Sequence, residues 1–198
     1  MLTMDNNDNL ISYSQNEFKK KYPNLDFQIN IIISIKNQKL YLLKERKIVH
    51  IYKISTSKFG LGNENDSFMT PLGFHYIAEK IGSKLPKNTI LKGRKPLKNN
   101  ITLDDLSKNE NLKIKDEYFN SSEDIITSRI LWLQGLEDGI NKGGNVDTYK
   151  RYIYIHGTIH ENLIGSEASH GCIRMYNDDV INLFELVEVN TPVHIINI

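Results

Sequence analysis

The sequence predicts a mainly β domain with a few short helices and one long polar insertion. Several short segments rich in β-branched and aromatic residues are separated by polar turns, which is typical of strands in a sheet. The length of 198 residues fits one domain with a substantial core. Hydrophobic residues make up 39% and charged residues 25%, with 12 glycines and 5 prolines, which excludes collagen-like, low-complexity and wholly disordered classes.

The N-terminal segment, residues 1–25, is predicted to be a polar arm that leads into a domain at residues 26–198. It has a weak helical pattern around Leu10, Ile11 and Phe18 and ends at Pro23. It lacks the basic start and apolar stretch of a secretory signal. We therefore expect a cytoplasmic protein, or a periplasmic one if the native N-terminus is missing.

Strands are expected along most of the domain because of its β-branched and aromatic composition. The predicted strands are residues 27–33 and 39–43, which form a hairpin, then 47–55, 74–79, 151–156 and 193–196. Residues 125–133 are ambiguous between a helix and a strand. One helix is predicted near the C-terminus, where Asn177 or Asp178 can act as the N-cap. The apolar residues that follow at helical spacing are Val180, Ile181, Phe184 and Val187.

The most polar and least periodic stretch is residues 82–124, which interrupts the predicted strands. The stretch is interpreted either as a long solvated insertion or as a lid over a substrate groove, because long irregular loops in compact domains are often functional.

The glycines at 60 and 62 do not form a dinucleotide site, since a third glycine and a following helix are absent from the pattern.

The net charge of the chain excludes partners that bind chiefly through long-range electrostatic attraction. A total of 25 Lys and Arg against 24 Asp and Glu gives a net charge of +1, so nothing steers the chain to nucleic acid or an anionic membrane. The most apolar stretch, residues 29–35, is far shorter than the roughly 20 residues that a membrane helix needs. No membrane span is therefore expected.

The densest group of reactive side chains lies between His156 and Arg174 and contains the single cysteine, Cys172. A thiol attacks carbon as a thiolate, and at its usual pKa of about 8.5 it needs a neighbouring base at neutral pH. His156 ends a predicted strand 16 residues before Cys172, so a loop can fold back and bring the two together. Gly171 lets backbone N–H groups near the sulfur converge on an oxyanion. This pattern predicts cysteine acyl transfer.

Two other interpretations of the same residues stay open. A lone cysteine is often a small buried hydrophobic residue, and a histidine at a strand end is often structural. His156, His160, His170 and Cys172 also have the chemistry of zinc ligands. An irregular loop without an acidic general base disfavours zinc, so no metal is expected.

The same residues resemble a known family. His156-Gly157-Thr158, followed by Ser169-His170-Gly171-Cys172-Ile173-Arg174-Met175, is similar to the signature of the L,D-transpeptidase (YkuD) family. The resemblance spans about residues 27–197, including the short segments 55–57, 70–74, 177–180 and 191–193. It implies a β-sandwich-like catalytic domain with few helices. Trp132 lies in a segment that resembles the border of the groove in one bacterial branch, but we expect it in the core.

The resemblance also implies roles for individual residues. Cys172 matches the nucleophile, which attacks the carbonyl that joins an L-centre to D-alanine in a peptidoglycan stem peptide. His156 matches the base, and His170 and Gly171 flank the nucleophile as oxyanion and positioning residues. The residues expected to contact or orient substrate are Ser169, Thr158 and Arg174. The Arg174 guanidinium can bind a carboxylate bidentately, with a structural salt bridge as the alternative.

The resemblance thus implies an enzyme without a cofactor whose partner is a peptidoglycan stem peptide, carried by a muropeptide or a precursor. Because a cytoplasmic enzyme would meet recycled or precursor fragments, we expect an L,D-carboxypeptidase that releases terminal D-alanine. The alternative is an L,D-transpeptidase that forms 3–3 cross-links. A zinc hydrolase and an inactive peptidoglycan-binding module are more remote. Family analogy also implies covalent capture of carbapenem-type inhibitors by Cys172.

Overall fold

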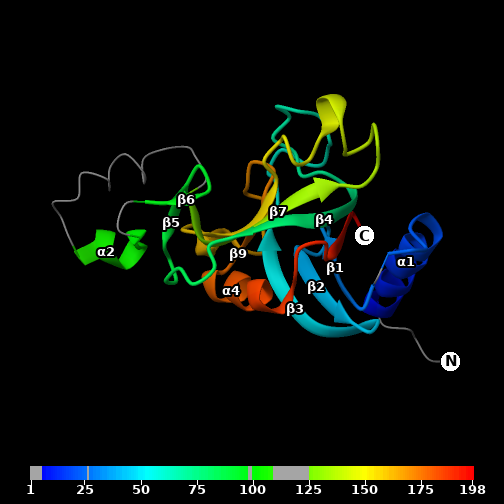
Figure 1. The fold of residues 1–198 in the computed structure, drawn as a ribbon, viewed down its shortest axis with the longest axis horizontal. Helices are drawn as coiled ribbons and strands as arrows, with labels where there is room; N and C mark the ends of the chain where they lie inside the picture. Colours follow the sequence, from blue (N-terminus) through cyan, green and yellow to red (C-terminus); the bar gives the residue numbers. More distant parts are fainter. Residues whose placement is uncertain (1–5, 26, 98–99, 109–124) are drawn as a thin grey trace.

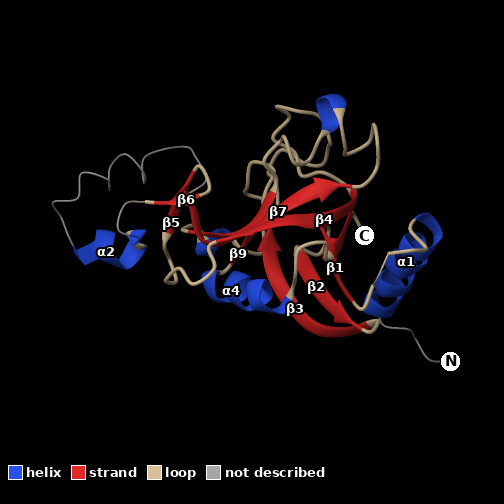
Figure 2. Cartoon of the chain, in the orientation of Figure 1, coloured by secondary structure: helices blue, strands red, loops and turns tan. Residues whose placement is uncertain are grey.

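The computed structural model describes residues 6–25, 27–97, 100–108 and 125–198. Its strands are β1 (Ile29–Ser34), β2 (Lys39–Lys44), β3 (Lys47–Ser55), β4 (Gly73–Ile81), β5 (Ile90–Lys92), β6 (Lys95–Pro96), β7 (Ile126–Gly135), β8 (Tyr154–Thr158), β9 (Ile173–Met175) and β10 (Pro192–Ile196). Its helices are α1 (Asn6–Lys21), α2 (Leu103–Lys108) and α4 (Asn177–Leu186), with 3-10 turns η2 (Gly144–Val146) and η3 (Glu161–Leu163). The predicted mainly β class is confirmed (Figure 2).

The strands form one sheet that closes on itself. Its order is β4-β10-β1-β2-β3-β9-β8-β7-β5-β6, and β4 also pairs with β7. The strands from β4 round to β7 therefore form a ring, from which β5 and β6 extend. Most pairs are antiparallel, but β1 pairs with β10 and β8 pairs with β9 in parallel. Figure 1 shows α1 at one end of the molecule and α2 with the β5–β6 hairpin at the other.

The main core lies inside the ring. Alternate side chains of the strands point inward, because successive residues of a strand face opposite sides of the sheet. β1 contributes Ile31 and Ile33, and β10 contributes Val193 and Ile195. The apolar face of α4 completes this core with Val180, Leu183, Phe184 and Val187. Ring and helix together hold β8 and β9 in place.

The outer face of β1, β2 and β10 is covered by α1. Leu10 and Ile11 of the helix pack with side chains of the sheet, which are Ile32, Tyr41, Leu43 and Ile196. Phe18, further along the helix, is also buried. The weak helical pattern in the predicted polar arm thus corresponds to a helix whose apolar side chains contact the sheet.

Most of the predicted elements are present, with three differences. The hairpin and the strand at 47–55 are confirmed, and the ambiguous segment at 125–133 is β7, which pairs with both β4 and β8. The predicted strand at 151–156 is wrong in its first half, because Arg151 and Tyr152 form a turn closed by hydrogen bonds to Asp147 O and Tyr149 O.

The second difference concerns the helix near the C-terminus. Its N-cap is Tyr176, not Asn177 or Asp178. The Asn177 side chain is buried and forms hydrogen bonds within the domain.

The third difference concerns the insertion at 82–124, whose described part contains secondary structure. β5 pairs with β7 through Ile90 and Thr127, and β6 and α2 follow it. Residues 98–99 and 109–124 of this segment lie outside the described residues.

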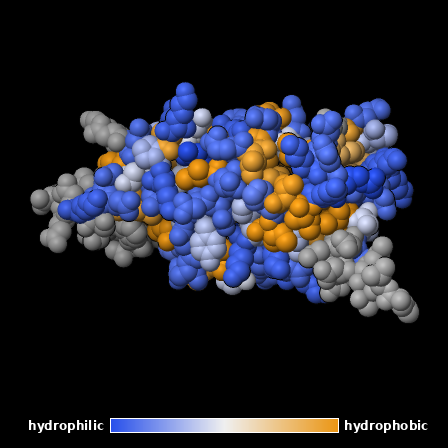
Figure 3. Space-filling view, turned by 90° about the horizontal axis from the view of Figure 1, so that it is seen from below, coloured by the Kyte–Doolittle hydropathy of each residue, from blue (hydrophilic) through white to orange (hydrophobic). Residues whose placement is uncertain are grey.

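Two surface properties complete the description. Across the described ranges, no helix is long and apolar enough to span a membrane. Seen from below, hydrophobic side chains gather over the part of the sheet that contains β2 and β3 (Figure 3). β3 carries the exposed apolar side chains Val49 and Ile51.

Two buried histidines make stability depend on pH. His75 forms contacts with Gly73 O (3.0 Å) and Thr148 Oγ1 (3.1 Å), and His194 stacks on Phe74 with ring centroids 4.0 Å apart. Burial lowers the pKa of His75 to about 4 and that of His194 to about 3. Both rings are therefore neutral in the folded protein at pH 5, whereas in the unfolded chain they take up protons below about pH 6.5.

The free energy of unfolding is expected to fall as the pH is lowered from 7 to 5. The unfolded state then binds more protons than the folded state, which costs up to about 1.4 kcal/mol per pH unit for each histidine. Urea unfolding at several pH values measures this slope, and His75→Gln should reduce it. An unfolding free energy that is constant over this range would contradict the expectation.

Candidate active site

Cys172 directly precedes β9 and lies at the surface end of a small apolar cluster. It packs against a cluster built from Leu91, Ile130, Trp132 and Tyr154. The Tyr154 N–H donates to its sulfur at 3.4 Å, and the thiol is 3.4 Å from Tyr152 O. The residue is half-buried, so the thiol is held in place but remains accessible.

His156 lies on the same face of the sheet as Cys172. In the parallel pair of β8 and β9, His156 is opposite Arg174, so continuation of the register by two residues places Tyr154 beside Cys172. Alternate residues of a strand share a face, and Cys172 packs in the same cluster as Tyr154. His156 and Cys172 are therefore diagonal neighbours on adjacent strands, with Cα atoms about 8 Å apart from the usual strand spacings. Such a diagonal is within reach of an aromatic side chain such as histidine.

The His156 ring is held in a defined tautomer. Its Nδ1 is 2.8 Å from Gly157 O, and a carbonyl oxygen can only accept, so Nδ1 carries the proton. In the neutral ring, Nε2 then carries the lone pair. The imidazole is fully buried within β8, which fixes its orientation. A ring in this form can take a proton from a thiol.

Ser169 holds the loop before Cys172 in place through hydrogen bonds. Its hydroxyl donates to Cys172 O at 2.6 Å and accepts from Gly171 N–H at 3.3 Å. Its backbone N–H donates to Thr56 O at 2.8 Å. Ser169 is fully buried, so the structure places it behind Cys172 as a support. A direct contact with substrate, as predicted from the sequence, stays a prediction.

Gly171 has a backbone conformation that favours glycine. Its φ is +117°, and an added Cβ would lie 3.2 Å from Ile153 Cδ1. Its carbonyl accepts a hydrogen bond from the buried Thr70 hydroxyl at 3.1 Å. This turn directs the loop from Ser169 into β9 and sets the position of the Cys172 backbone.

Several aromatic side chains pack near Cys172, and one arginine stacks on two of them. The rings of Trp132 and Tyr149 stack with centroids 4.0 Å apart, and Trp132 is buried as expected. The Arg94 guanidinium carbon lies 4.8 Å from the Trp132 ring and 4.9 Å from the Tyr152 ring. Arg94 also donates to the Tyr154 hydroxyl at 3.3 Å, a hydrogen bond that raises the arginine's pKa. A positive charge is therefore held against Trp132 and Tyr154, two rings of the cluster that Cys172 packs against.

A second arginine, Arg151, forms hydrogen bonds with the loop at residues 60–70. Its guanidinium donates to Gly62 O at 3.1 Å and to Met69 O at 2.7 Å. Burial lowers the pKa of Arg151, and the nearby Cys172 counteracts this. A pocket of about 300 Å³ lies alongside, lined by Asn65, Asp66, Phe68, Lys150, Arg151, Tyr152, Ile153 and His170. His170 borders this pocket and also lies 5.5 Å from the Phe59 ring.

Asn177 supports β8 from beneath. Its Oδ1 accepts from the hydroxyls of Thr127 (2.7 Å) and Ser128 (2.6 Å), and its Nδ2 donates to Thr158 O at 3.0 Å. The backbone of Gly157 passes so close that an added Cβ would lie 2.5 Å from Asn177 Oδ1. This network fixes the strand that carries His156.

The sequence also singled out Arg174, Thr158 and His160, which follow or face His156. Arg174 is directly opposite His156 but only 3% exposed, so its predicted contact with a substrate carboxylate stays a prediction. Thr158 is buried, and its hydroxyl accepts from His160 N–H at 3.1 Å. Within the described part of the chain, no three His, Cys, Asp or Glu side chains are grouped so that they could hold a metal ion.

Comparison with known sequences gives a family match over most of the chain. The sequence model of the L,D-transpeptidase catalytic domain (YkuD) matches residues 28–195. Two curated relatives from Bacillus subtilis (strain 168) are similar over shorter stretches. YqjB is 51% identical over 39 residues, which cover 20% of this chain and 22% of that protein. YkuD is 43% identical over 60 residues, which cover 28% of this chain and 37% of that protein.

Solved structures show the same fold at low sequence identity. L,D-transpeptidase 3 from Mycobacterium tuberculosis is similar with a TM-score of 0.51 and 14% identity, over 86% of this chain and 61% of that chain. The structure of that enzyme with a faropenem-derived adduct has a TM-score of 0.50 and 14% identity, over 85% and 60%. The similarity thus covers less than two thirds of each of these relatives.

Proposed function

Since the chain belongs to the L,D-transpeptidase catalytic domain family, we propose that it is a cysteine acyl-transfer enzyme that releases the terminal D-alanine from peptidoglycan tetrapeptide stems. The observation that supports this most is the placement of Cys172 and His156 on one face of adjacent strands. The accessible thiol and the oriented imidazole are the groups that such a reaction needs.

In the proposed first half-reaction, His156 Nε2 accepts the proton of the Cys172 thiol. The sulfur attacks the carbonyl carbon that precedes D-alanine, and backbone N–H groups around Cys172 stabilise the oxyanion. The C–N bond then breaks, the proton returns from His156 to the amine, and D-alanine leaves. The acyl group remains on the sulfur as a thioester.

In the proposed second half-reaction, water attacks the thioester with His156 as the base. The products are a tripeptide stem and the free thiol, so the enzyme acts as an L,D-carboxypeptidase. An amine from a second stem in place of water would give a 3–3 cross-link. The first half-reaction is the same for both outcomes.

We also propose that Arg94 binds a carboxylate of the stem peptide. A guanidinium can form paired hydrogen bonds with a carboxylate, and Arg94 is held over Trp132 and Tyr152 close to Cys172. Arg94 is half-buried, whereas Arg174 is almost fully buried. This makes Arg94 the more accessible of the two arginines.

The Arg94→Ala variant is expected to raise KM for the tetrapeptide by about 10- to 100-fold, which corresponds to the loss of one hydrogen-bonded charge pair. The kcat value should change much less, because the thiol and imidazole are untouched. Steady-state kinetics of D-alanine release measure both constants. Lys95→Ala is the matched control, since this exposed cation lies in the same hairpin. An unchanged KM in Arg94→Ala would rule out this role.

Incubation of the protein with a disaccharide tetrapeptide, followed by mass analysis of the products, tests the proposed function. The expected product is the tripeptide, lighter by one alanine residue, together with free D-alanine. A cross-linked dimer would instead show transpeptidation, and an unchanged substrate would indicate a binding module. Activity should persist in the presence of a chelator, whereas its loss would favour a zinc hydrolase.

A further inference from the structure

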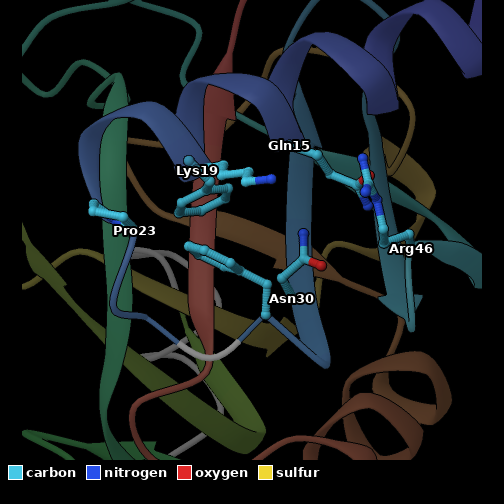
Figure 4. Close-up of a pocket in the computed structure, with 7 residues that line it drawn as sticks. Gln15, Lys19, Pro23, Asn30 and Arg46 are labelled. Carbon is cyan, nitrogen blue, oxygen red and sulfur yellow. The ribbon is translucent and has the colours of Figure 1, made fainter.

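A second pocket lies between α1 and the outer face of the sheet, apart from the residues around Cys172. Its volume is about 210 Å³, and its lining is Gln15, Phe18, Lys19, Pro23, Phe27, Asn30 and Arg46. In Figure 4, α1 passes over the pocket and β1 forms its floor. The family match begins at residue 28, so α1 lies outside it. The pocket is therefore built largely by the segment that precedes the matched domain.

The floor of this pocket carries a buried polar group that nothing in the described residues satisfies. Asn30 is 1% exposed, and neither its Nδ2 nor its Oδ1 has a hydrogen-bond partner among those residues. Figure 4 shows the Asn30 amide extending from β1 into the space below the helix. Buried side-chain amides in folded proteins almost always have partners. This amide therefore presents both a donor and an acceptor to an occupant of the pocket.

The upper side of the pocket adds donors and positive charge. The Gln15 Oε1 accepts from Arg46 Nε at 2.9 Å, and the buried Gln15 Nε2 has no hydrogen-bond partner in the described ranges. Lys19 and Arg46 also line the pocket, and no lining residue that the structure describes is acidic. Such a set of donors and cations favours an anion, above all a carboxylate.

The remaining lining is apolar. The rings of Phe18 and Phe27 lie 4.9 Å apart, and Pro23 adjoins them. An occupant can therefore bury an apolar group against this side while its charge meets the cations. The volume is below the range of pockets for drug-sized ligands, about 300–1,000 Å³, so a small molecule fits.

From these features we propose that the pocket binds a small 2-hydroxy carboxylic acid with an apolar side chain. The carboxylate accepts hydrogen bonds from Asn30 Nδ2 and Gln15 Nε2 near the two cations. The hydroxyl donates to Asn30 Oδ1, and the side chain packs against Phe18 and Phe27. The positive charge of Lys19 and Arg46 favours a ligand with a net negative charge over a zwitterionic amino acid.

Calorimetric titration of the full chain with three probes tests the ligand chemistry. The probes are 2-hydroxy-4-methylpentanoate, 4-methylpentanoate, which lacks the hydroxyl, and L-leucine, which is zwitterionic. The hydroxy acid should bind about 10-fold more tightly than either comparator, because only it satisfies the amide and has a net charge. Absence of binding at millimolar concentration, or equal affinity for all three probes, would overturn the proposal.

Variants of the lining residues test the location. Asn30→Leu should weaken binding of the hydroxy acid at least about 10-fold and, without ligand, raise the thermal midpoint, because a buried amide without partners is removed. Arg46→Gln, at an exposed position that tolerates change, should weaken binding several-fold. Lys47→Gln, at the neighbouring exposed position, is the control and should leave binding unchanged. Unchanged affinity in Arg46→Gln, or in a folded Asn30→Leu, would place the ligand elsewhere and refute the site.

Discussion

The Cys172→Ala variant is expected to lose D-alanine release by at least about 10⁴-fold, because the sulfur that we propose forms the acyl intermediate is absent. The fold should remain intact, since Cys172 is half-buried at the edge of its cluster and alanine fits the same space. Product analysis with the tetrapeptide measures activity, and thermal unfolding measures stability. Persistent release of D-alanine by the folded variant would end the assignment of Cys172 as nucleophile.

Covalent capture provides a second readout for the same variant. A carbapenem should add its mass once to the wild-type chain, through attack of Cys172 on the β-lactam carbonyl. The Cys172→Ala variant should show no such addition. Lys58→Ala, which changes a surface residue and leaves the thiol in place, is a matched control and should be modified like the wild type. A mass increase on Cys172→Ala would point to a different nucleophile.

The Asn177→Ala variant is expected to lose about 3–5 kcal/mol of stability and most of its activity. Its side chain satisfies the hydroxyls of Thr127 and Ser128 and the carbonyl of Thr158, and all of them are left buried after truncation. The strand with His156 also loses its support where Gly157 passes closest. Denaturant unfolding measures the first effect, and D-alanine release measures the second.

Asn182→Ala is the matched control for this prediction. Asn182 lies on the same helix, α4, but is exposed and accepts one hydrogen bond from the Tyr52 hydroxyl. Its truncation should cost less than about 1 kcal/mol. Equal losses of stability in the two variants would show that the Asn177 network contributes no more than an exposed hydrogen bond.

The features that the sequence could predict are local in the chain. The strand at 47–55 is encoded by its β-branched and aromatic residues and has the predicted bounds. The reactive side chains between His156 and Cys172 can also be recognised from the sequence, because the family signature lies within a short stretch. The positions of these two residues on one face then follow from the parallel register of β8 and β9.

The features that the sequence could not predict depend on distant contacts. Asn177 looks like a helix cap, but Thr127, 50 residues earlier, provides a buried partner for its side chain. Arg94 looks like one of several cations in a polar insertion. Its place over Trp132 arises because β5 pairs with the first residues of β7, which no local pattern reveals. The amide of Asn30 likewise gains its surroundings only when α1 packs on β1.

The place of β10 in the ring has a consequence for biosynthesis. This strand lies between β1 and β4, so the ring keeps a gap until residues 192–196 have left the ribosome. Until then, the edges of β1 and β4 that flank the gap are unpaired, and such edges can join strands of other nascent chains. Closure of the ring therefore waits for β10, and its rate includes the search of this strand for two partners far back in the polypeptide.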